Sequence, residues 1–354
     1  MTVTYPKLAY IEDSIKRIQG NLASKSCLIL RNTTAEGIKP YLRYILALDG
    51  FDLTIHWGHY DNILQDASGL REYSGWIDID TIIVWFWLEA ALSKEPHVDE
   101  LGRVKEFERI SSYCKAVIDG IRSNSDANIL WMGFENPIRS SLFQGAHDKS
   151  TEEWLVSSLN TKVKEYLSEA KNAFFVSTQA CLERVGEHNY YDRRYWYSSK
   201  APFSRDAMAI LALEMGKHFR NLNGCVRKLL VLDADQTLWG GIVGEDGIEG
   251  IELGDSNIGL AYIAFQRKIL ELRKNGVILA LCSKNNYDDV VEVFRRNPDM
   301  PLSLDHFSAV QINWDDKPSN ILKICSELNL GLGSVVFVDD SEYEINIVGT
   351  ACLK

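Results

Sequence analysis

The sequence predicts an α/β protein made of two doubly wound parallel sheets that follow one another along the chain. Short apolar runs of strand length recur, and helix-length amphipathic segments separate most of them. Such alternation is typical of a parallel sheet whose strands are joined by crossover helices. One segment, HNYYDRRYWYSSKAPFSRDAM at 188–208, interrupts the alternation. We therefore expect two domains.

The first domain is expected over residues 1–200. Its five predicted strands are apolar runs rich in β-branched and aromatic residues, at 26–31, 51–57, 81–88, 128–134 and 173–178. Long amphipathic helices are predicted at 98–121 and 150–170, the second with a capping-box pattern at Ser150 and Glu153. A further helix at 203–219 lies in a segment, 201–225, that we interpret as a linker helix.

The second domain is expected over residues 226–354, where the alternation resumes. Its predicted strands lie at 228–233, 277–283, 306–313 and 334–340. Its predicted helices lie at 258–276, 285–297 and 317–330, and the glycine at 276 closes the first of them. Right-handed crossovers would make this an open, doubly wound sheet, in which ligands bind at the carboxyl ends of the strands.

Composition excludes several classes of protein. With 354 residues, 46% of them hydrophobic and 25% charged, the chain can bury two cores. The net charge of −11 and the lack of a basic run argue against a nucleic-acid partner. The seven cysteines form no CxxC pair, so we expect neither disulfides nor zinc. The N-terminus lacks the pattern of a signal peptide, and the densest apolar stretch, 81–92, is too short to span a bilayer. We expect a cytoplasmic protein with no membrane partner.

Polar residues gather where the strands of the second domain end. In chain order they are Asp233, Asp235, Ser283, Lys317, Asp339 and Asp340. The carboxyl ends of parallel strands meet at one edge, so these groups should lie together. Several carboxylates beside one ammonium repel one another, and a divalent cation would neutralise them. Hard oxygen ligands without His or Cys indicate Mg²⁺, for which we predict the ligands Asp233, Asp235, Asp339 and Asp340.

This set of residues suits phosphoryl transfer. Asp233 would be the nucleophile that forms an aspartyl-phosphate. Asp235, two residues later, would protonate the leaving oxygen and then activate water. Ser283 would donate a hydrogen bond to the phosphoryl group, and Lys317 would balance its charge. Since a carboxylate leaving group needs no proton and an alkoxide does, Asp235 favours a phosphate monoester as substrate.

Four segments resemble, in order, the four motifs of the haloacid dehalogenase (HAD) superfamily. They are LLVLDADQT from Leu229, CSKNN from Cys282, NWDDKPSN around Lys317, and VVFVDD from Val335. The order separates this pattern from a receiver domain, whose phosphorylated Asp stands alone and whose Lys lies on the last strand. The resemblance implies a HAD fold for residues 226–354. Only the segment GGIVGEDGIEGIEL, at 240–253, follows Asp235, so we expect a hairpin-like, minimal cap.

The blocks DADQTLWGGIVGEDGIEGIELGD, SKNN and INWDDK resemble the FkbH-like branch more closely. This implies a protein that dephosphorylates a phosphoglycerate-derived unit and helps to load glyceryl onto an acyl carrier protein in polyketide or polysaccharide biosynthesis. It also implies an N-terminal SGNH-like, flavodoxin-type domain and a C-terminal acetyltransferase-like domain. The second of these is missing, so the C-terminus is expected to be truncated, with the final helix barely begun, and acyl transfer by this chain is doubtful.

The resemblance also implies substrate-binding residues, namely Thr237, Trp239, Gly240, Asn285 and Glu344. The chain departs from the branch at three places. Gln236 stands where Asn is usual, and Ala234 stands where Leu is common. Ser341-Glu342 replace an Asn-Pro pair, so contacts with substrate after Asp340 should differ.

The first domain is expected to be non-catalytic. Its first strand leads into Asn32-Thr33-Thr34 without the serine of an SGNH hydrolase, and Tyr195 stands where a histidine should follow Asp192. Asn32, His56 and His59 would line a retained pocket or make structural hydrogen bonds. Two alternatives stay open for the whole chain: a stand-alone sugar or glycerate phosphatase, and a non-catalytic module that binds a phosphorylated ligand. The intact pair Asp233 and Asp235 argues against the second.

Overall fold

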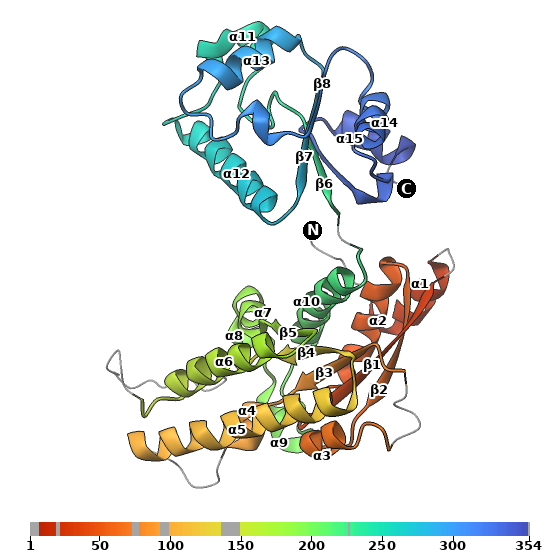
Figure 1. Ribbon diagram of the computed structural model, residues 1–354, viewed down its shortest axis with the longest axis vertical. Helices are drawn as coiled ribbons and strands as arrows, with labels where there is room; N and C mark the ends of the chain where they lie inside the picture. Colours follow the sequence, from red (N-terminus) through yellow and green to blue (C-terminus); the bar gives the residue numbers. More distant parts are fainter. Residues whose placement is uncertain are drawn as a thin grey trace. The chain divides into compact units, whose positions relative to one another are not determined.

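The computed structural model describes residues 7–18, 22–72, 78–92, 99–135, 149–225 and 227–352. The chain forms two compact units, Met1–Gly224 and Cys225–Lys354 (Figure 1). Each unit contains one parallel sheet with helices on both faces, which confirms the predicted fold class. None of the helices in these ranges has the length and hydrophobicity that crossing a bilayer requires.

The sheet of the first unit has five parallel strands in the order β2-β1-β3-β4-β5. The strands are β1 (Ala23–Arg31), β2 (Phe51–Trp57), β3 (Thr81–Trp85), β4 (Asn128–Met132) and β5 (Ala173–Val176). The chain moves outward to β2 first and then returns past β1 to β3. The carboxyl ends of β1 and β3 therefore frame the point at which the winding reverses.

Alternate strand residues of the first unit feed two separate cores, because successive side chains of a strand point to opposite faces. Ile29, Ile83 and Leu130 pack with α1 (Ile11–Arg17), α2 (Lys39–Leu48), α7 (Thr178–Val185) and α10 (Arg205–Leu222). Leu28, Ile82 and Ile129 pack with α3 (Ile63–Ser68), α5 (Glu100–Asn124) and α6 (Glu152–Glu169). Three short helices complete the unit: α4 (Leu88–Ala91), α8 (Glu187–Tyr190) and α9 (Arg193–Ser199).

Helix α10 differs from the linker helix that the sequence suggested for residues 201–225. It begins at Ser204, whose side chain accepts a hydrogen bond from the N–H of Ala207, and it buries an apolar stripe that includes Leu211 and Met215. These residues belong to the core of the first unit. An amphipathic pattern predicts a helix but does not say which core covers it. The capping box proposed at Ser150 is also wrong, because Thr151 caps α6.

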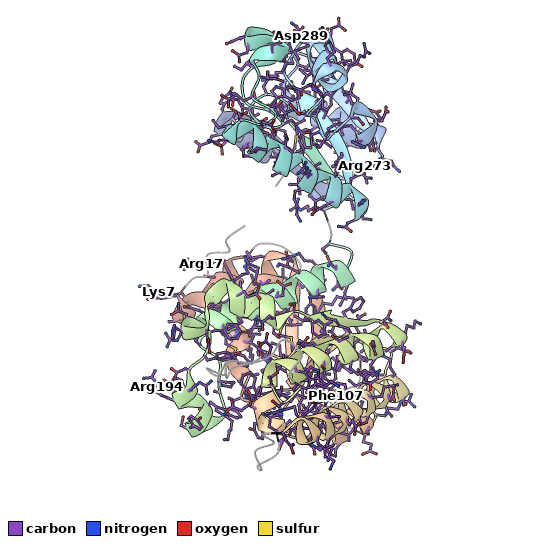
Figure 2. The ribbon with its side chains drawn as sticks, turned by 90° about the vertical axis from the view of Figure 1, so that its left-hand side faces the viewer. Lys7, Arg17, Phe107, Arg194, Arg273 and Asp289 are labelled. Carbon is purple, nitrogen blue, oxygen red and sulfur yellow. The ribbon has the colours of Figure 1, made fainter. Side chains whose placement is uncertain are left out.

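The sheet of the second unit has four parallel strands in the order β8-β7-β6-β9. They are β6 (Leu229–Leu232), β7 (Ile278–Ser283), β8 (Ala309–Ile312) and β9 (Val335–Val338). Helices α11 (Val243–Gly250), α12 (Asn257–Lys274) and α13 (Tyr287–Arg296) cover one face, and α14 (Lys317–Glu327) and α15 (Glu342–Ala351) cover the other. The polar sides of these helices face outward, as the exposed Arg273 near the end of α12 illustrates (Figure 2).

Two expectations about the second unit are corrected. The segment 240–253 is not a hairpin: a single antiparallel bridge between Gly240 and Glu252 closes a loop that contains the helix α11. The last helix is also more than a beginning, because α15 has ten residues, its N-cap Ser341 accepts a hydrogen bond from Glu344 N, and it buries Val348.

Candidate functional site

Asp233 lies in the middle of the carboxyl edge of the second sheet, directly after the central strand β6. Its N–H donates to the carbonyl of Val338 in β9 at 3.0 Å, which prolongs the strand pairing and fixes the residue at the edge. Only 6% of its surface is exposed. The sequence produces this burial because four apolar residues precede Asp233 in β6.

Lys317 neutralises part of the charge at this edge. It opens α14, whose N-cap Asp316 accepts a hydrogen bond from Ser319 N at 2.9 Å. The buried Nζ lies 3.0 Å from Asp233 Oδ1 and donates to Asp339 Oδ2. Burial alone would lower the pKa of the Lys317 ammonium, but the charges of Asp233 and Asp339 outweigh it and raise the pKa. Lys317 is therefore a permanent cation between two carboxylates.

Three carboxylates converge beside this cation. Asp233, Asp339 and Asp340 each bring one oxygen within 4.8 Å of the other two. Burial raises the pKa of Asp233 to about 6, although the charge of Lys317 lowers it; Asp339 adds to the rise. Among the described residues no well-directed hydrogen bond reaches the buried Asp233 Oδ1, although Lys317 lies within ion-pair distance. Three carboxylates beside a single ammonium leave a net negative charge, and such a set of oxygen donors fits a divalent cation such as Mg²⁺.

Asp235 does not join this cluster. Its Oδ1 accepts hydrogen bonds from Trp239 Nε1 at 2.9 Å and from Val243 N at 3.1 Å, and its Oδ2 accepts one from Asn285 Nδ2 at 2.7 Å. Three N–H donors therefore hold this carboxylate, and it does not belong to the group of three converging acidic side chains. That Asp235 is a fourth metal ligand stays a prediction. Its place beside Asp233 at the strand end agrees with the prediction.

A tight turn separates the two aspartates from Trp239. The N–H groups of Thr237 and Leu238 both donate to the carbonyl of Ala234, at 3.2 and 2.7 Å. Gln236, in the middle of the turn, has a φ of 55°, which an L-residue with a side chain adopts only at a cost. This turn redirects the chain so that Trp239 faces back toward Asp235.

The residues predicted to bind substrate are all at this edge, but most of them have protein partners. Trp239 and Asn285 donate to Asp235. Gly240 pairs with Glu252, and a Cβ there would lie 3.0 Å from Glu252 Cβ, so a larger residue would have to displace the Glu252 side chain. Thr237 is buried in the turn. That these four residues contact substrate stays a prediction.

Lys284 is a residue of this edge that the sequence did not single out. Its Nζ donates to Glu344 Oε1 at 2.7 Å, so the fifth residue predicted to bind substrate is part of an ion pair. Lys284 immediately follows the predicted Ser283, and a cation directly after a strand end was a signal that could have identified it. Ser283 itself is buried at the end of β7, 3.4 Å from Asn285 Nδ2, as expected for an edge residue.

Two of the three residues proposed for a pocket or for structural hydrogen bonds in the first unit, Asn32 and His59, make hydrogen bonds within the protein. Asn32 accepts from the N–H of Trp87 at 2.6 Å and donates to its carbonyl at 3.0 Å, which ties the end of β1 to that of β3. His59 Nδ1 lies 2.9 Å from the buried Asp66. His56 lies near the end of β2 and is half-buried.

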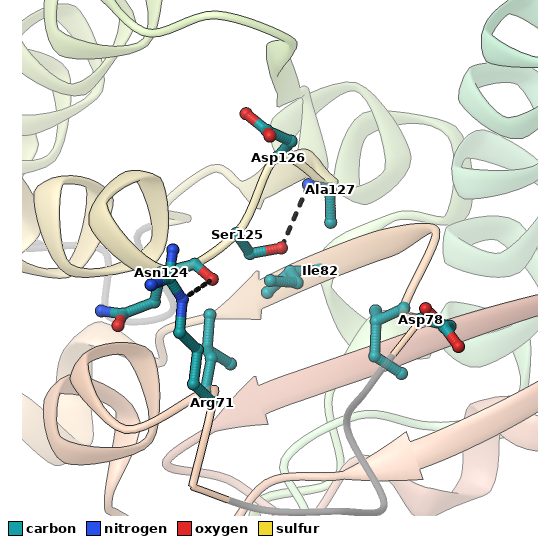
Figure 3. A pocket seen from close by; sticks show the side chains of 9 residues that line it. Arg71, Asp78, Ile82, Asn124, Ser125, Asp126 and Ala127 are labelled. Carbon is teal, nitrogen blue, oxygen red and sulfur yellow. Dashed lines mark hydrogen bonds between the residues drawn. The ribbon is translucent and has the colours of Figure 1, made fainter.

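A cavity of about 390 Å³ in the first unit lies at the opposite edge of the sheet, at the amino ends of β3 and β4 (Figure 3). Arg71 occupies one side of it and donates through Nε to the carbonyl of Asn124 at 3.1 Å. Ligands of open parallel sheets collect at the carboxyl ends of the strands, so this cavity is not where the fold would place a catalytic site.

Fold and site together define a class: an α/β protein of two parallel-sheet units, with an acidic, lysine-containing site at the carboxyl edge of the second sheet. A solved structure shares this fold. The N-terminal part of the protein BF1531 from Bacteroides fragilis, which contains a phosphatase domain and was crystallised in complex with Mg, superposes with a TM-score of 0.85 and is 24% identical. The match covers 98% of this chain and 92% of that one.

The other comparisons add no argument. LAE5, an α/β hydrolase from the metagenome of Lake Arreo in Spain, has a TM-score of 0.32 and 9% identity over 58% of this chain and 97% of its own, which is too low to carry a conclusion. No protein-family model and no curated protein matches this chain.

Proposed function

We propose that the second unit is a Mg²⁺-dependent phosphatase of the HAD type, which works through an aspartyl-phosphate on Asp233. One observation carries the proposal: a buried carboxylate at a strand end faces an ammonium and two further carboxylates, while a separate carboxylate, Asp235, lies two residues away outside that cluster. Nucleophilic displacement at phosphorus needs such a division between an anion-stabilising site and an acid–base group.

The residues divide the reaction into two balanced steps. Asp233 attacks phosphorus, the bond from phosphorus to the substrate oxygen breaks, and that oxygen takes a proton from Asp235. Water then attacks the aspartyl-phosphate and gives its proton to Asp235, and the bond between phosphorus and Asp233 breaks to release phosphate. Lys317 holds Asp233 in place and offsets negative charge in both steps, and Ser283 is the proposed hydrogen-bond donor to the phosphoryl oxygens.

Asp233, Asp339 and Asp340 are the residues that would hold Mg²⁺. A bound Mg²⁺ would supply positive charge for the phosphoryl oxygens and relieve the repulsion among the three carboxylates. The Mg in the complex of the BF1531 fragment supports this choice of cation, because the two proteins share the fold.

The substrate is proposed from the FkbH-like resemblance. We infer a phosphate monoester of the glycerate type, processed in the cytoplasm and destined for an acyl carrier protein in polyketide or polysaccharide biosynthesis. A stand-alone sugar or glycerate phosphatase would use the same chemistry in another pathway. The first unit, proposed to be SGNH-like, would take no part in the chemistry, since Asn32 and His59 are engaged in hydrogen bonds within the protein.

The proposal is tested by phosphate release in the presence of Mg²⁺ from a panel that includes 3-phosphoglycerate and a phosphoglyceryl-loaded carrier protein. We expect turnover by the wild-type chain, and a loss of at least 1000-fold, on the order of what a covalent nucleophile contributes, in Asp233→Asn. Asp315→Asn is the matched control, because Asp315 lies at the same edge but pairs with Lys323 on the surface. Binding of phosphate without turnover would instead support a binding module.

A further inference from the structure

The carboxylate of Asp235 is held by three N–H groups from three different places in the chain. Trp239 Nε1 and Val243 N lie 2.9 and 3.1 Å from Oδ1, and Asn285 Nδ2 lies 2.7 Å from Oδ2. Trp239 is fully buried, and its ring packs edge-on against Phe294 at 5.9 Å. Asn285 is 5% exposed. Because Trp239 and Asn285 are both buried, neither can exchange its hydrogen bond with Asp235 for one with water.

The two oxygens of Asp235 are not equivalent in this arrangement. An ionised carboxylate has about four acceptor positions, two on each oxygen. Among the residues that the structure describes, two N–H groups fill those of Oδ1, whereas the single bond from Asn285 leaves one position on Oδ2 open. Within this set of contacts, Oδ2 is therefore the oxygen that can accept a proton without breaking a hydrogen bond to the protein.

We propose that Trp239 and Asn285 are positioning residues for Asp235, which fix its orientation so that Oδ2 is the atom that carries the proton. Oδ2 gives its proton to the leaving oxygen in the first step and receives the proton of water in the second. This inference rests on the phosphatase function proposed above. It reassigns two residues that the sequence suggested as contacts for substrate.

The same contacts separate the roles of the two aspartates. A carboxylate two residues from Asp233 would otherwise be free to turn toward the acidic cluster and any cation there. The buried N–H of a tryptophan requires an acceptor, and Asp235 provides one, so turning away would leave that donor unsatisfied at a cost of about 1–3 kcal/mol. These three hydrogen bonds therefore keep Asp235 available for proton transfer.

The test compares leaving groups, because only a poor leaving group needs a proton. We would measure kcat/KM for 4-nitrophenyl, phenyl and benzyl phosphate, in this order of increasing need for protonation, with the wild-type chain, Trp239→Phe and Asn285→Leu. Trp239→Phe keeps the ring against Phe294 and removes the N–H. We expect each variant to lose at least 10-fold more activity on benzyl phosphate than on 4-nitrophenyl phosphate, within the range of 10²–10⁴-fold that a general acid contributes.

Controls separate positioning from stability and from substrate binding. Trp314→Phe removes an indole N–H at the same edge that donates to Asn286 Oδ1 and not to Asp235, so it should leave the leaving-group dependence unchanged. In an Asp235→Asn background, Trp239→Phe should have no further effect on that dependence. Circular dichroism checks folding, and if one of the two variants fails to fold, the other decides.

Three results would overturn the inference. Equal losses on all three substrates would indicate a structural role, and an increase in KM alone would indicate substrate contact. An additional loss in the Asp235→Asn background would show that Trp239 acts on something else. If the wild-type chain hydrolyses none of the three esters and none of the panel above, the proposed function fails and this inference fails with it.

Discussion

Gln236 shows how the site constrains a single backbone position. Its φ of 55° places it in the left-handed region, inside the turn that leads from Asp235 to Trp239. Its side chain is exposed, and its carbonyl accepts a hydrogen bond from Tyr262 Oη at 3.5 Å. The backbone, not the side chain, is therefore what the turn requires. Asparagine, which the resembling family has here, adopts this conformation more readily.

Replacement of Gln236 by Asn is expected to raise the free energy of unfolding by roughly 0.5–1 kcal/mol, because it relieves this local strain. Thermal and denaturant unfolding would measure the change. Gln179→Asn is the matched control, since Gln179 lies in the right-handed helix α7, where Asn is slightly less favourable. Equal effects of the two substitutions would contradict the argument.

Glu135 is a buried titratable residue in the first unit. It follows β4, is 3% exposed, and accepts a hydrogen bond from Tyr190 Oη at 2.7 Å. Burial raises its pKa to about 7, although hydrogen bonds from Tyr190 and Thr178 lower it. A carboxyl whose pKa is higher in the folded state favours folding when it is protonated. Its contribution is present below the unfolded pKa and is lost as the pH rises through about 7.

We expect Glu135→Gln to stabilise the first unit relative to the wild-type chain, increasingly between pH 4.5 and 7 and with a constant difference above that. Glutamine keeps the acceptor for Tyr190 and never carries a charge. The full difference is about 3 kcal/mol, from the size of the pKa shift. Urea unfolding of both proteins across this pH range measures it, with Glu183→Gln as a control for the replacement of an exposed carboxyl group. A pH-independent difference would rule out Glu135 as the titrating group.

At the scale of elements, the close approach of α10 and α2 makes α10 part of the first unit. Gly216 of α10 lies where a Cβ would come within 2.5 Å of Ile45 Cγ2 in α2. Glycine disfavours a helix interior, so its presence in α10 is explained by this contact. The helix can lie flat against α2 only because the side chain is missing.

Gly216→Ala should lower the free energy of unfolding of the first unit by roughly 1 kcal/mol, since overpacking costs about 1–3 kcal/mol and the gain in helix propensity returns part of it. Gly349→Ala in α15 is the matched control: a Cβ there meets nothing within 4 Å, so that substitution should stabilise the second unit. Adding Ile45→Leu, which removes the branch methyl group, should recover part of the loss. Without such recovery the contact with Ile45 is not the cause.

At the scale of the whole molecule, the proposed cation site belongs to one of two compact units. Asp233, Asp339 and Asp340 all lie within Cys225–Lys354. A ligand that binds only the folded state stabilises it by an amount that depends on concentration, about 2.7 kcal/mol at 100 times its Kd. The stabilisation should be confined to the unit that contains the ligands.

We expect Mg²⁺ to slow hydrogen exchange of the core amides of residues 227–352 and to leave those of the first unit unchanged. The effect should weaken as the pH falls below about 6, because Asp233 must be ionised to bind the cation and burial raises its pKa to about that value. Asp233→Asn should abolish the response. Protection that spreads equally over both units would contradict a site held by the second unit alone.

Much of the fold could be predicted from the sequence because its signals are local. All nine strands of the described residues coincide with apolar runs, and the rule that ligands gather at strand ends correctly predicted that Asp233, Lys317 and Asp339 share one edge. The prediction of a hairpin at 240–253 was wrong because a Gly-rich segment is compatible with a tight turn and with a short helix. The interpretation of α10 as a linker failed because an amphipathic pattern does not identify the core against which a helix packs.

The sequence by itself determined the order of the strands and helices, the two sheets and the residue types at the edge, since these follow from hydrophobic periodicity and from chemistry carried by individual side chains. Only the tertiary structure decided which carboxylates converge and which one is held apart. Asp235 and Asn285 are 50 residues apart, yet 2.7 Å separates Oδ2 from Nδ2. Hydrogen-bond partners that are so far apart in the sequence are brought together by the packing of neighbouring strands. A local sequence pattern cannot predict that packing.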